Sequence, residues 1–171
     1  MEWIDVYDSR HLPTGRVKSR GSKFSSGEFR LHVFTVIQNS QGQVLLTLRD
    51  AAKDTYPNLW GHTGGAVRAG ETSLQAIARE VQEETGIDAA PEEFIFLCTR
   101  CNPDWHSLTD LYLLRRDVPR SQIVLQAGET ADARWVSFQQ LEDMMRCGQL
   151  AAPDAGRWHQ LKELIEQQRR P

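Results

Sequence analysis

The chain has 171 residues, of which 25% are charged and 40% hydrophobic, and its formal net charge is −3. This length is typical of one globular domain, and the near-neutral balance gives no general argument for binding to nucleic acid or to a membrane surface. The longest apolar runs, such as "LHVFTVI" and "EFIFLC", have the length of a β-strand and fall far short of a bilayer-spanning helix.

The N-terminal stretch "MEWIDVYDSRHLPTGR" begins with the alternation typical of a strand and predicts a turn at Pro13 to Gly15. A polar connection, "VKSRGSKFSSGEF", follows it. The acidic N-terminus lacks an apolar core of signal-peptide length, so we expect a cytoplasmic protein. We interpret residues 1–28 as an extension of a single domain that spans residues 1–171.

Two strands are predicted next, "RLHVFTVI" and "QVLLTLR", joined as a hairpin by the turn "QNSQG". A loop interrupted by Pro57 leads to a glycine-rich stretch and then to a helix. The helix is expected to begin at Ser73, because Thr72 and Gln75 form a capping-box pattern, and to stop at Gly86. Helical spacing predicts a buried face formed by Leu74, Ile77, Ala78 and Val81.

The second half of the chain mixes strands and helices without a regular order. The segments "EEFIFLCTR", "SLTDLYLLRR" and "ARWVS" predict strands, and "FQQLEDMMRCG" predicts a helix ended by Gly148. After Pro153 a last amphipathic helix is expected over about residues 155–168. Its apolar side would be formed by Trp158, Leu161, Leu164 and Ile165. This order predicts an α+β (mixed α/β) sandwich, since regular βαβ alternation is missing.

Cys98 and Cys101 form a C-x-x-C pattern. A structural zinc site needs a second pair of ligands, and the one other thiol is Cys147. A thioredoxin-like motif would open a helix, whereas "CTRCNPDW" runs from a strand into a turn. We therefore interpret the cysteines as incidental thiols.

Three glutamates crowd the predicted helix, with Arg79 beside them. A helix advances by about 100° per residue, which places Glu80 and Glu84 one turn apart on a flank of the buried face, with Glu83 next to them. Like charges at this spacing repel by roughly 0.2–0.5 kcal/mol per pair. One interpretation is a solvated helix face. The other is a site for Mg²⁺ or Mn²⁺, which prefer oxygen ligands.

The preceding glycines favour the metal interpretation. Glycine permits close backbone approach to a ligand, and Gly64 and Gly65 bring the backbone towards the same helix, where a carbonyl can serve as a further oxygen ligand. A substrate phosphate would complete the coordination of the ion.

From Gly65 to Ile87 the sequence reads "GAVRAGETSLQAIAREVQEETGI", which resembles a complete Nudix box with every fixed position filled. The flanking segments "PNLWGHTGG" and "ETADARWVSFQQL" are similar to Nudix proteins as well. The resemblance implies a Nudix-type α/β/α sandwich with a mixed, curved sheet, in which residues 64–87 form the loop and helix of the box. It also implies metal-dependent cleavage of a nucleoside diphosphate linked to another group.

The resemblance assigns metal binding to the acidic face of the helix. It implies that Glu80 and Glu84 are metal ligands, that Glu83 is a third ligand or the general base, and that Gly64 contributes its backbone carbonyl. The expected cofactor is Mg²⁺, with Mn²⁺ as a substitute.

Other residues of the box receive supporting roles from the same resemblance. Arg79 would orient a catalytic glutamate, and Glu71 would make a structural salt bridge near the start of the helix. Gly65 and Gly86 would shape the box. The general base varies within the family and can come from a loop, where Glu129 is a candidate. Its alternative is a solvated turn residue.

The expected reaction is attack of water on a phosphoanhydride, with cations stabilising the developing charge and a carboxylate taking the proton. Arg49 and Lys53 follow a strand end just before the box and are candidates to bind the non-reacting phosphate. Ordinary surface charges are the alternative for these two residues.

Within the family, the N-terminal half resembles the subgroup related to isopentenyl-diphosphate isomerase. That enzyme class needs a cysteine and a metal-binding histidine before the helix, and these places are held here by Gly64 and Ala66. No cysteine precedes Cys98, so a hydrolase is favoured over an isomerase. A third class is a non-catalytic nucleotide or metabolite sensor, but such proteins commonly lose box carboxylates that this chain retains.

The expected partner is a small-molecule nucleoside phosphate, without nucleic acid or membrane. A nucleoside di- or triphosphate is the first candidate, and a nucleotide sugar or dinucleoside polyphosphate is the second. Four aromatic side chains are candidates to stack on a base or sugar, with burial in the core as the alternative: Trp60, His62, Trp105 and His106. Because Nudix folds often dimerise, the oligomeric state is left open between a monomer and a homodimer.

Overall fold

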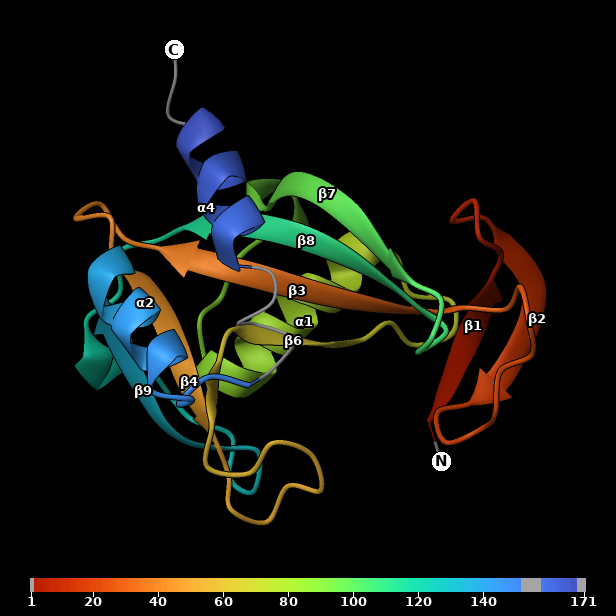
Figure 1. Ribbon diagram of the computed structural model, residues 1–171, viewed down its shortest axis with the longest axis horizontal. Coiled ribbons are helices and arrows are strands. Elements are labelled where there is room, and N and C mark those ends of the chain that lie inside the picture. The colour runs from red at the N-terminus through yellow and green to blue at the C-terminus, as the bar shows by residue number, and fades with distance from the viewer. Residues whose placement is uncertain (1, 152–157, 169–171) are drawn as a thin grey trace.

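A mixed β-sheet forms the centre of the structure, a computed structural model that describes residues 2–151 and 158–168 (Figure 1). Five of its strands lie in the order β5-β4-β3-β8-β7, β6 pairs with β3, and β9 pairs with β4. The strands are β3 (Arg30–Gln38), β4 (Val44–Arg49), β5 (Trp60–Gly61), β6 (Thr63–Ala66), β7 (Ile95–Asn102), β8 (Ser107–Arg115) and β9 (Thr130–Val136). The pair β3–β8 is parallel and its neighbours are antiparallel, so the predicted α+β class with a mixed sheet is confirmed.

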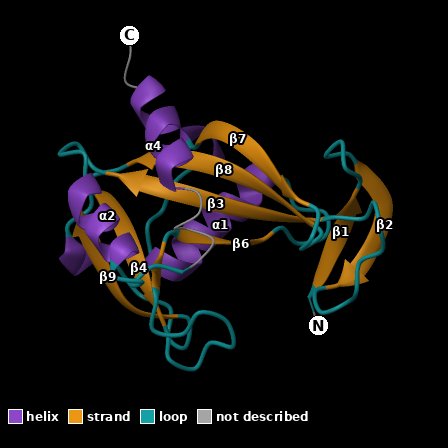
Figure 2. Ribbon diagram, viewed as in Figure 1, coloured by secondary structure: helices purple, strands orange, loops and turns teal. Residues whose placement is uncertain are grey.

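Helices cover both faces of this sheet (Figure 2). Helix α1 (Ser73–Thr85) lies on one face, and α2 (Phe138–Arg146) and α4 (Trp158–Gln167) lie on the other. Alternating residues of the central strands feed two separate cores, as expected for strands buried on both faces. The core under α1 contains Leu31, Val33, Ile77, Val81 and Leu108. The core under α2 and α4 contains Phe34, Val36, Leu111, Leu141, Trp158 and Leu161.

The predicted hairpin of β3 and β4 exists, but the two strands diverge directly after the turn. The two strands pair at Gln38 and Val44, after which β4 pairs with β9 and β5. The first half of β3 takes β6 as its antiparallel partner, with Phe34 opposite Gly64 and Val33 opposite Gly65. This divergence makes room for the glycine-rich strand beside α1.

The boundaries of α1 agree with the sequence prediction. Thr72 and Gln75 form the capping box, and Gly86 ends the helix with a left-handed φ of 70°. The predicted buried face is wrong at Leu74, which is 37% exposed. Leu74 lies in the first turn, where the end of a helix has fewer covering neighbours. Burial is centred instead on Ala76, Ile77, Val81 and Thr85.

The N-terminal residues form a separate two-stranded sheet of β1 (Trp3–Tyr7) and β2 (Pro13–Ser19). The turn predicted at Pro13 to Gly15 lies earlier, because the Asp8 carboxylate accepts hydrogen bonds from the backbone N–H groups of Arg10 and Leu12 at 2.9 and 3.0 Å. An aspartate commonly organises a turn in this way, and a proline is tolerated as the first residue of a strand.

The C-terminal predictions hold for the described residues. Helix α2 follows a capping box formed by Ser137 and Gln140. In α4, Trp158, Leu161 and Ile165 are buried, and Leu164 is partly buried. Pro153 and the expected first turn of the last helix, residues 155–157, lie outside the described residues. None of the described helices combines the length and the apolar character needed to cross a membrane.

Candidate active site

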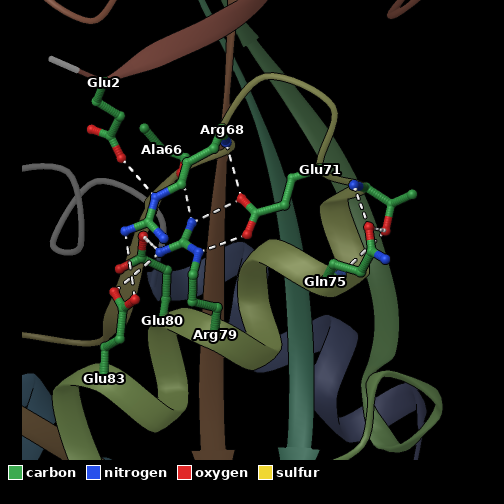
Figure 3. A network of polar contacts seen from close by, with 9 residues as sticks. Glu2, Ala66, Arg68, Glu71, Gln75, Arg79, Glu80 and Glu83 are labelled. Carbon is green, nitrogen blue, oxygen red and sulfur yellow. Dashed lines mark hydrogen bonds and ion pairs between the residues drawn. The ribbon is translucent and has the colours of Figure 1, made fainter.

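Arg79 lies at the centre of a group of carboxylates on one face of α1 (Figure 3). Its Nε and Nη2 atoms donate to the two oxygens of Glu71 at 2.7 and 3.0 Å. Its Nη1 atom donates to Glu80 at 2.7 Å and to Glu83 at 3.2 Å. Burial acts to lower the pKa of Arg79, but the hydrogen bonds to Glu71 and Glu80 outweigh it and raise that pKa. One guanidinium group therefore fixes three carboxylates.

Glu80 is held from the opposite side by the glycine-rich strand. A Cβ atom added at Gly65 would lie only 2.3 Å from Oε1 of Glu80, which is far inside van der Waals contact, so the carboxylate occupies space that a side chain at this position would fill. The Glu80 side chain is 15% exposed. Burial raises its pKa, and the hydrogen bond from Arg79 opposes this shift without cancelling it.

Glu84 lies one turn further along α1, beside Gly64. The backbone N–H of Gly64 donates a hydrogen bond to the Glu84 carboxylate, and the metal-binding role of the Gly64 carbonyl stays a prediction. Burial and then the charge of Glu80 raise the pKa of Glu84 to about 8, although Arg49 and Gly64 act in the opposite direction. Burial is therefore the main cause of the shift, and the neighbouring carboxylate of Glu80 adds to it.

The residues predicted from the sequence outside the box, Arg49, Lys53 and Glu129, also lie near this cluster. Glu129 adds to the negative charge around Glu84, and Arg49 is a counter-charge to it. Lys53 forms an ion pair with Glu129, which ties two separately predicted residues together. Arg49 donates from Nε to the carbonyl of Thr55 at 2.9 Å. The structure thus brings these residues to one place, and their chemical roles remain predictions.

The aromatic candidates do not form one group. Trp60 and His62 are both 9% exposed, and the His62 ring lies 5.1 Å from Phe34 and 6.2 Å from Trp158 in the core. Trp105 is 71% exposed, and Nδ1 of His106 contacts the carbonyl of Glu28 at 3.1 Å. The core interpretation therefore fits Trp60 and His62.

The donor set on α1 suits a hard divalent cation. The partly buried carboxylates of Glu80, Glu83 and Glu84 supply oxygen atoms of the kind that Mg²⁺ and Mn²⁺ prefer. Burial, with the charge of Glu80 as a second cause, raises the pKa of Glu84, and a bound cation would favour its ionised form. Within residues 2–151 and 158–168, no three His, Cys, Asp or Glu side chains are already gathered as a metal site. The oxygen donors of this cluster therefore suit a divalent cation. In the structure, Glu80 and Glu83 are hydrogen-bonded to Arg79, and Glu80 also lies against the glycine-rich strand.

Two polar residues at the edge of the cluster were missed by the sequence predictions. Arg68 lies in the loop between β6 and α1, with its Nη2 atom 3.5 Å from Oε1 of Glu83. Its Nε atom donates to Glu2 at 2.9 Å. No local pattern indicates this arrangement, because Glu2 and Arg68 are 66 positions apart.

Comparison with known proteins identifies relatives across most of the chain. A family model described as the NUDIX domain matches residues 28–169. An uncharacterized Nudix hydrolase of Listeria monocytogenes is 37% identical over 153 residues, which cover 86% of this chain and 86% of that protein. An isopentenyl-diphosphate Delta-isomerase of Escherichia coli is 25% identical over 96 residues, which cover 56% of this chain and 53% of the isomerase.

Solved structures share the same fold at lower sequence identity. DR0079 from Deinococcus radiodurans has a TM-score of 0.74 and 24% identity, with 99% of this chain and 100% of that chain covered. The NUDIX domain of Shewanella oneidensis NrtR, in complex with ADP ribose, has a TM-score of 0.64 and 22% identity, with 85% and 90% covered. These solved structures therefore share the α+β sandwich fold of this chain.

Proposed function

The chain belongs to the Nudix family, and on that premise we propose that it is a metal-dependent hydrolase that cleaves a phosphoanhydride bond in a nucleoside diphosphate derivative. The observation that carries this proposal is the confinement of Glu80 and Glu84 between α1 and the backbone of Gly64 and Gly65. A solvated helix face would leave these carboxylates free in water. Here they are partly buried and close enough to repel each other.

Glu80, Glu83 and Glu84 would hold the divalent cation. A bound Mg²⁺ or Mn²⁺ supplies charge stabilisation for the phosphoryl oxygens and lowers the pKa of the attacking water. Arg79 keeps Glu80 and Glu83 in fixed positions through its Nη1 atom, which is the positioning role proposed for it. Glu71 holds the other edge of the same guanidinium group, so its role is structural.

Two carboxylates are candidates to accept the proton of the attacking water. The Glu83 side chain is 35% exposed and therefore accessible to solvent from its place on the cluster. Glu129 is 41% exposed and paired with Lys53. A general base must reach the water it deprotonates. The base is therefore the residue whose substitution, Glu83→Gln or Glu129→Gln, lowers kcat without weakening metal binding, since loss of a metal ligand would weaken metal binding as well.

We propose a nucleoside diphosphate linked to a further group as the substrate class, with nucleoside di- and triphosphates as members to test. The complex of the NrtR domain with ADP ribose supports a ligand of this kind for a related fold. Arg49 lies near Glu84 and can bind a phosphate oxygen through its guanidinium group. Lys53 is available for the same task once its ion pair with Glu129 opens.

Prenyl-diphosphate isomerisation is disfavoured by the position of the first cysteine. Cys98 packs against the core under α2 and α4, whereas the acidic cluster lies on α1 at the other face of the sheet. Its burial raises the pKa of the Cys98 thiol, which lowers its reactivity. The distant similarity to the isomerase is therefore assigned to shared ancestry of the fold. A sensor function is disfavoured by the retained carboxylates.

The proposal is tested by incubating the purified chain with Mg²⁺ or Mn²⁺ and a panel of nucleoside di- and triphosphates, nucleotide sugars, ADP ribose and dinucleoside polyphosphates. We expect cleavage that requires the metal and that falls by about 10²–10³-fold in Glu84→Gln. Glu163→Gln changes an exposed carboxylate on α4 and serves as the matched control. Absence of cleavage across the panel, or full activity in Glu84→Gln, would overturn the proposal.

A further inference from the structure

The N-terminal sheet contacts the loop of the Nudix box at several points, although its residues lie outside the segment that the family model matches. The backbone N–H of Ala69 donates to the carbonyl of Trp3 at 2.8 Å. The N–H of Gly70 donates to the carboxylate of Asp5 at 2.8 Å. Strand β1 therefore fixes the backbone of the loop that leads into α1.

A chain of side chains continues this contact into the acidic cluster (Figure 3). The Nε atom of Arg68 donates to Oε1 of Glu2 at 2.9 Å, and its Nη2 atom lies 3.5 Å from Oε1 of Glu83. The other oxygen of Glu83, Oε2, accepts from Arg79 at 3.2 Å. Glu83 is thus held on one oxygen by its own helix and on the other by the loop.

Stability alone gives a poor account of this arrangement. The side chains of Glu2, Arg68 and Glu83 are 27%, 44% and 35% exposed, and ion pairs at such exposure contribute little to stability. Their geometric effect is larger, because a carboxylate held on both oxygens loses the freedom to rotate. Fixed orientation is what a metal ligand or general base requires, since a small misplacement of a catalytic group lowers the rate.

We propose that Glu2 and Arg68 are positioning residues that orient the Glu83 carboxylate from outside α1, so that the N-terminal sheet takes part in assembling the active site. This inference rests on the proposed hydrolase function. Glu2 acts through Arg68, and Arg68 acts through Glu83. Neither residue is assigned a contact with substrate.

The test compares Arg68→Gln, Glu2→Gln and the double variant in the full chain. Arg10→Gln is the matched control, because Arg10 lies in the turn of the same N-terminal sheet but pairs with Asp8 instead of Glu2, and its side chain is 77% exposed. We expect kcat to fall about fivefold in Arg68→Gln and about threefold in Glu2→Gln, with KM within about twofold of wild type. The double variant should match Arg68→Gln alone, because the two residues act in series. Arg10→Gln should keep the wild-type kcat.

A conservative variant separates orientation from packing. Arg68→Lys retains the charge that faces Glu83 but offers a single nitrogen, so it should recover about half of the lost kcat and should no longer respond to Glu2→Gln. Melting temperatures of all variants should stay within about 4 °C of wild type, the shift expected for about 1 kcal/mol in a chain of this size. A residue that only supports the fold would lower the melting temperature and leave kcat unchanged.

Amide hydrogen exchange of residues 67–71 in metal-free protein gives a readout that does not need the reaction. We expect faster exchange in Arg68→Gln and Glu2→Gln and wild-type exchange in Arg10→Gln. If the wild-type protein cleaves no substrate, the proposed hydrolase function is wrong. The amide exchange rates then still show whether Glu2 and Arg68 fix the loop of residues 67–71. Active wild type with unchanged kcat in both variants, or additive effects in the double variant, would overturn the positioning role itself.

Discussion

Glu28 of the N-terminal region and Glu84 of α1 are the same residue type in opposite electrostatic surroundings. Glu28 is 6% exposed, and hydrogen bonds from Lys18 and the backbone of Ser25 lower its pKa to about 2. Arg16 adds a further hydrogen bond at 2.6 Å. Glu84 instead has Glu80 and Glu129 as neighbours, and burial raises its pKa to about 8.

The difference separates a structural charge from one that we propose to be functional. Glu28 has cationic partners that complete its hydrogen bonds. It therefore joins β2 to the start of β3 without a further counter-charge. Glu84 and its neighbours share the guanidinium groups of Arg79 and Arg49 among several carboxylates. Strongly perturbed carboxylates in such clusters are typical of functional sites, and a divalent cation would supply the missing positive charge.

The substitutions with the largest expected effect remove one arginine partner from each region. Arg79→Gln leaves Glu71, Glu80 and Glu83 without their shared partner, and we expect the free energy of unfolding to fall by about 3 kcal/mol, together with loss of hydrolysis. Arg16→Gln should cost less than about 1 kcal/mol, because Arg16 is 59% exposed and Glu28 keeps Lys18. Urea unfolding measures both. Equal losses of unfolding free energy in the two variants would mean that Arg79 stabilises the protein no more than an ordinary surface arginine does.

Substitution of the two glycines of the site should have a smaller effect on the free energy of unfolding, and one that differs between the two positions. A Cβ at Gly64 would lie 2.3 Å from the carbonyl oxygen of Val33, a backbone atom, so Gly64→Ala should lower the free energy of unfolding by about 1–3 kcal/mol. A Cβ at Gly65 would meet the movable carboxylate of Glu80. Gly65→Ala should therefore lose less than about 1 kcal/mol but lower kcat about tenfold through the displaced carboxylate. Urea unfolding and steady-state kinetics on both variants check this, and a stability loss in Gly65→Ala as large as in Gly64→Ala would contradict it.

The smallest expected effect is the pH dependence of stability in metal-free protein. Between its ordinary pKa of 4.5 and the folded value of about 8, Glu84 binds a proton more tightly in the folded state, so its contribution is present at low pH and is lost as the pH rises. From pH 7 to 8 the free energy of unfolding should fall by about 1 kcal/mol. Glu84→Gln should remove this slope.

Glu28 should give the opposite slope at acid pH. Its pKa is lowered from 4.5 to about 2, so its contribution is present above pH 4.5 and is lost as the pH falls through this window. Urea unfolding of wild type, Glu84→Gln and Glu28→Gln across the pH range measures both slopes. A Glu84→Gln profile parallel to wild type above pH 7 would show that folding does not raise the pKa of Glu84.

Local features of the site were predictable because their determinants lie within a few residues of each other. Thr72, Gln75 and Gly86 set the limits of α1, and those limits place Glu80, Glu83 and Glu84 on one flank. The same reasoning failed at Leu74, because exposure at the end of a helix depends on what covers it. It also failed at Pro13, where the hydrogen bonds of Asp8 move the turn.

Long-range features had no local signal. The separation of β3 from β4 and the insertion of β6 depend on the whole sheet. The contact of Glu2 with Arg68 joins positions 66 residues apart, and Lys53 meets Glu129 across 76 positions. The sequence therefore predicted the groups of the cluster and its local partner Arg79, whereas the structure was needed to find the remote partners Glu2 and Arg68.

Titration of metal-free protein with Mn²⁺, followed by the electron paramagnetic resonance signal of the free ion, tests most directly whether the acidic face of α1 holds a divalent cation. We predict that wild type and Glu163→Gln bind Mn²⁺ with equal affinity and that Glu84→Gln binds it roughly 10–100-fold more weakly. Unaltered Mn²⁺ affinity in Glu84→Gln, or a wild-type protein that takes up no Mn²⁺, would contradict the account.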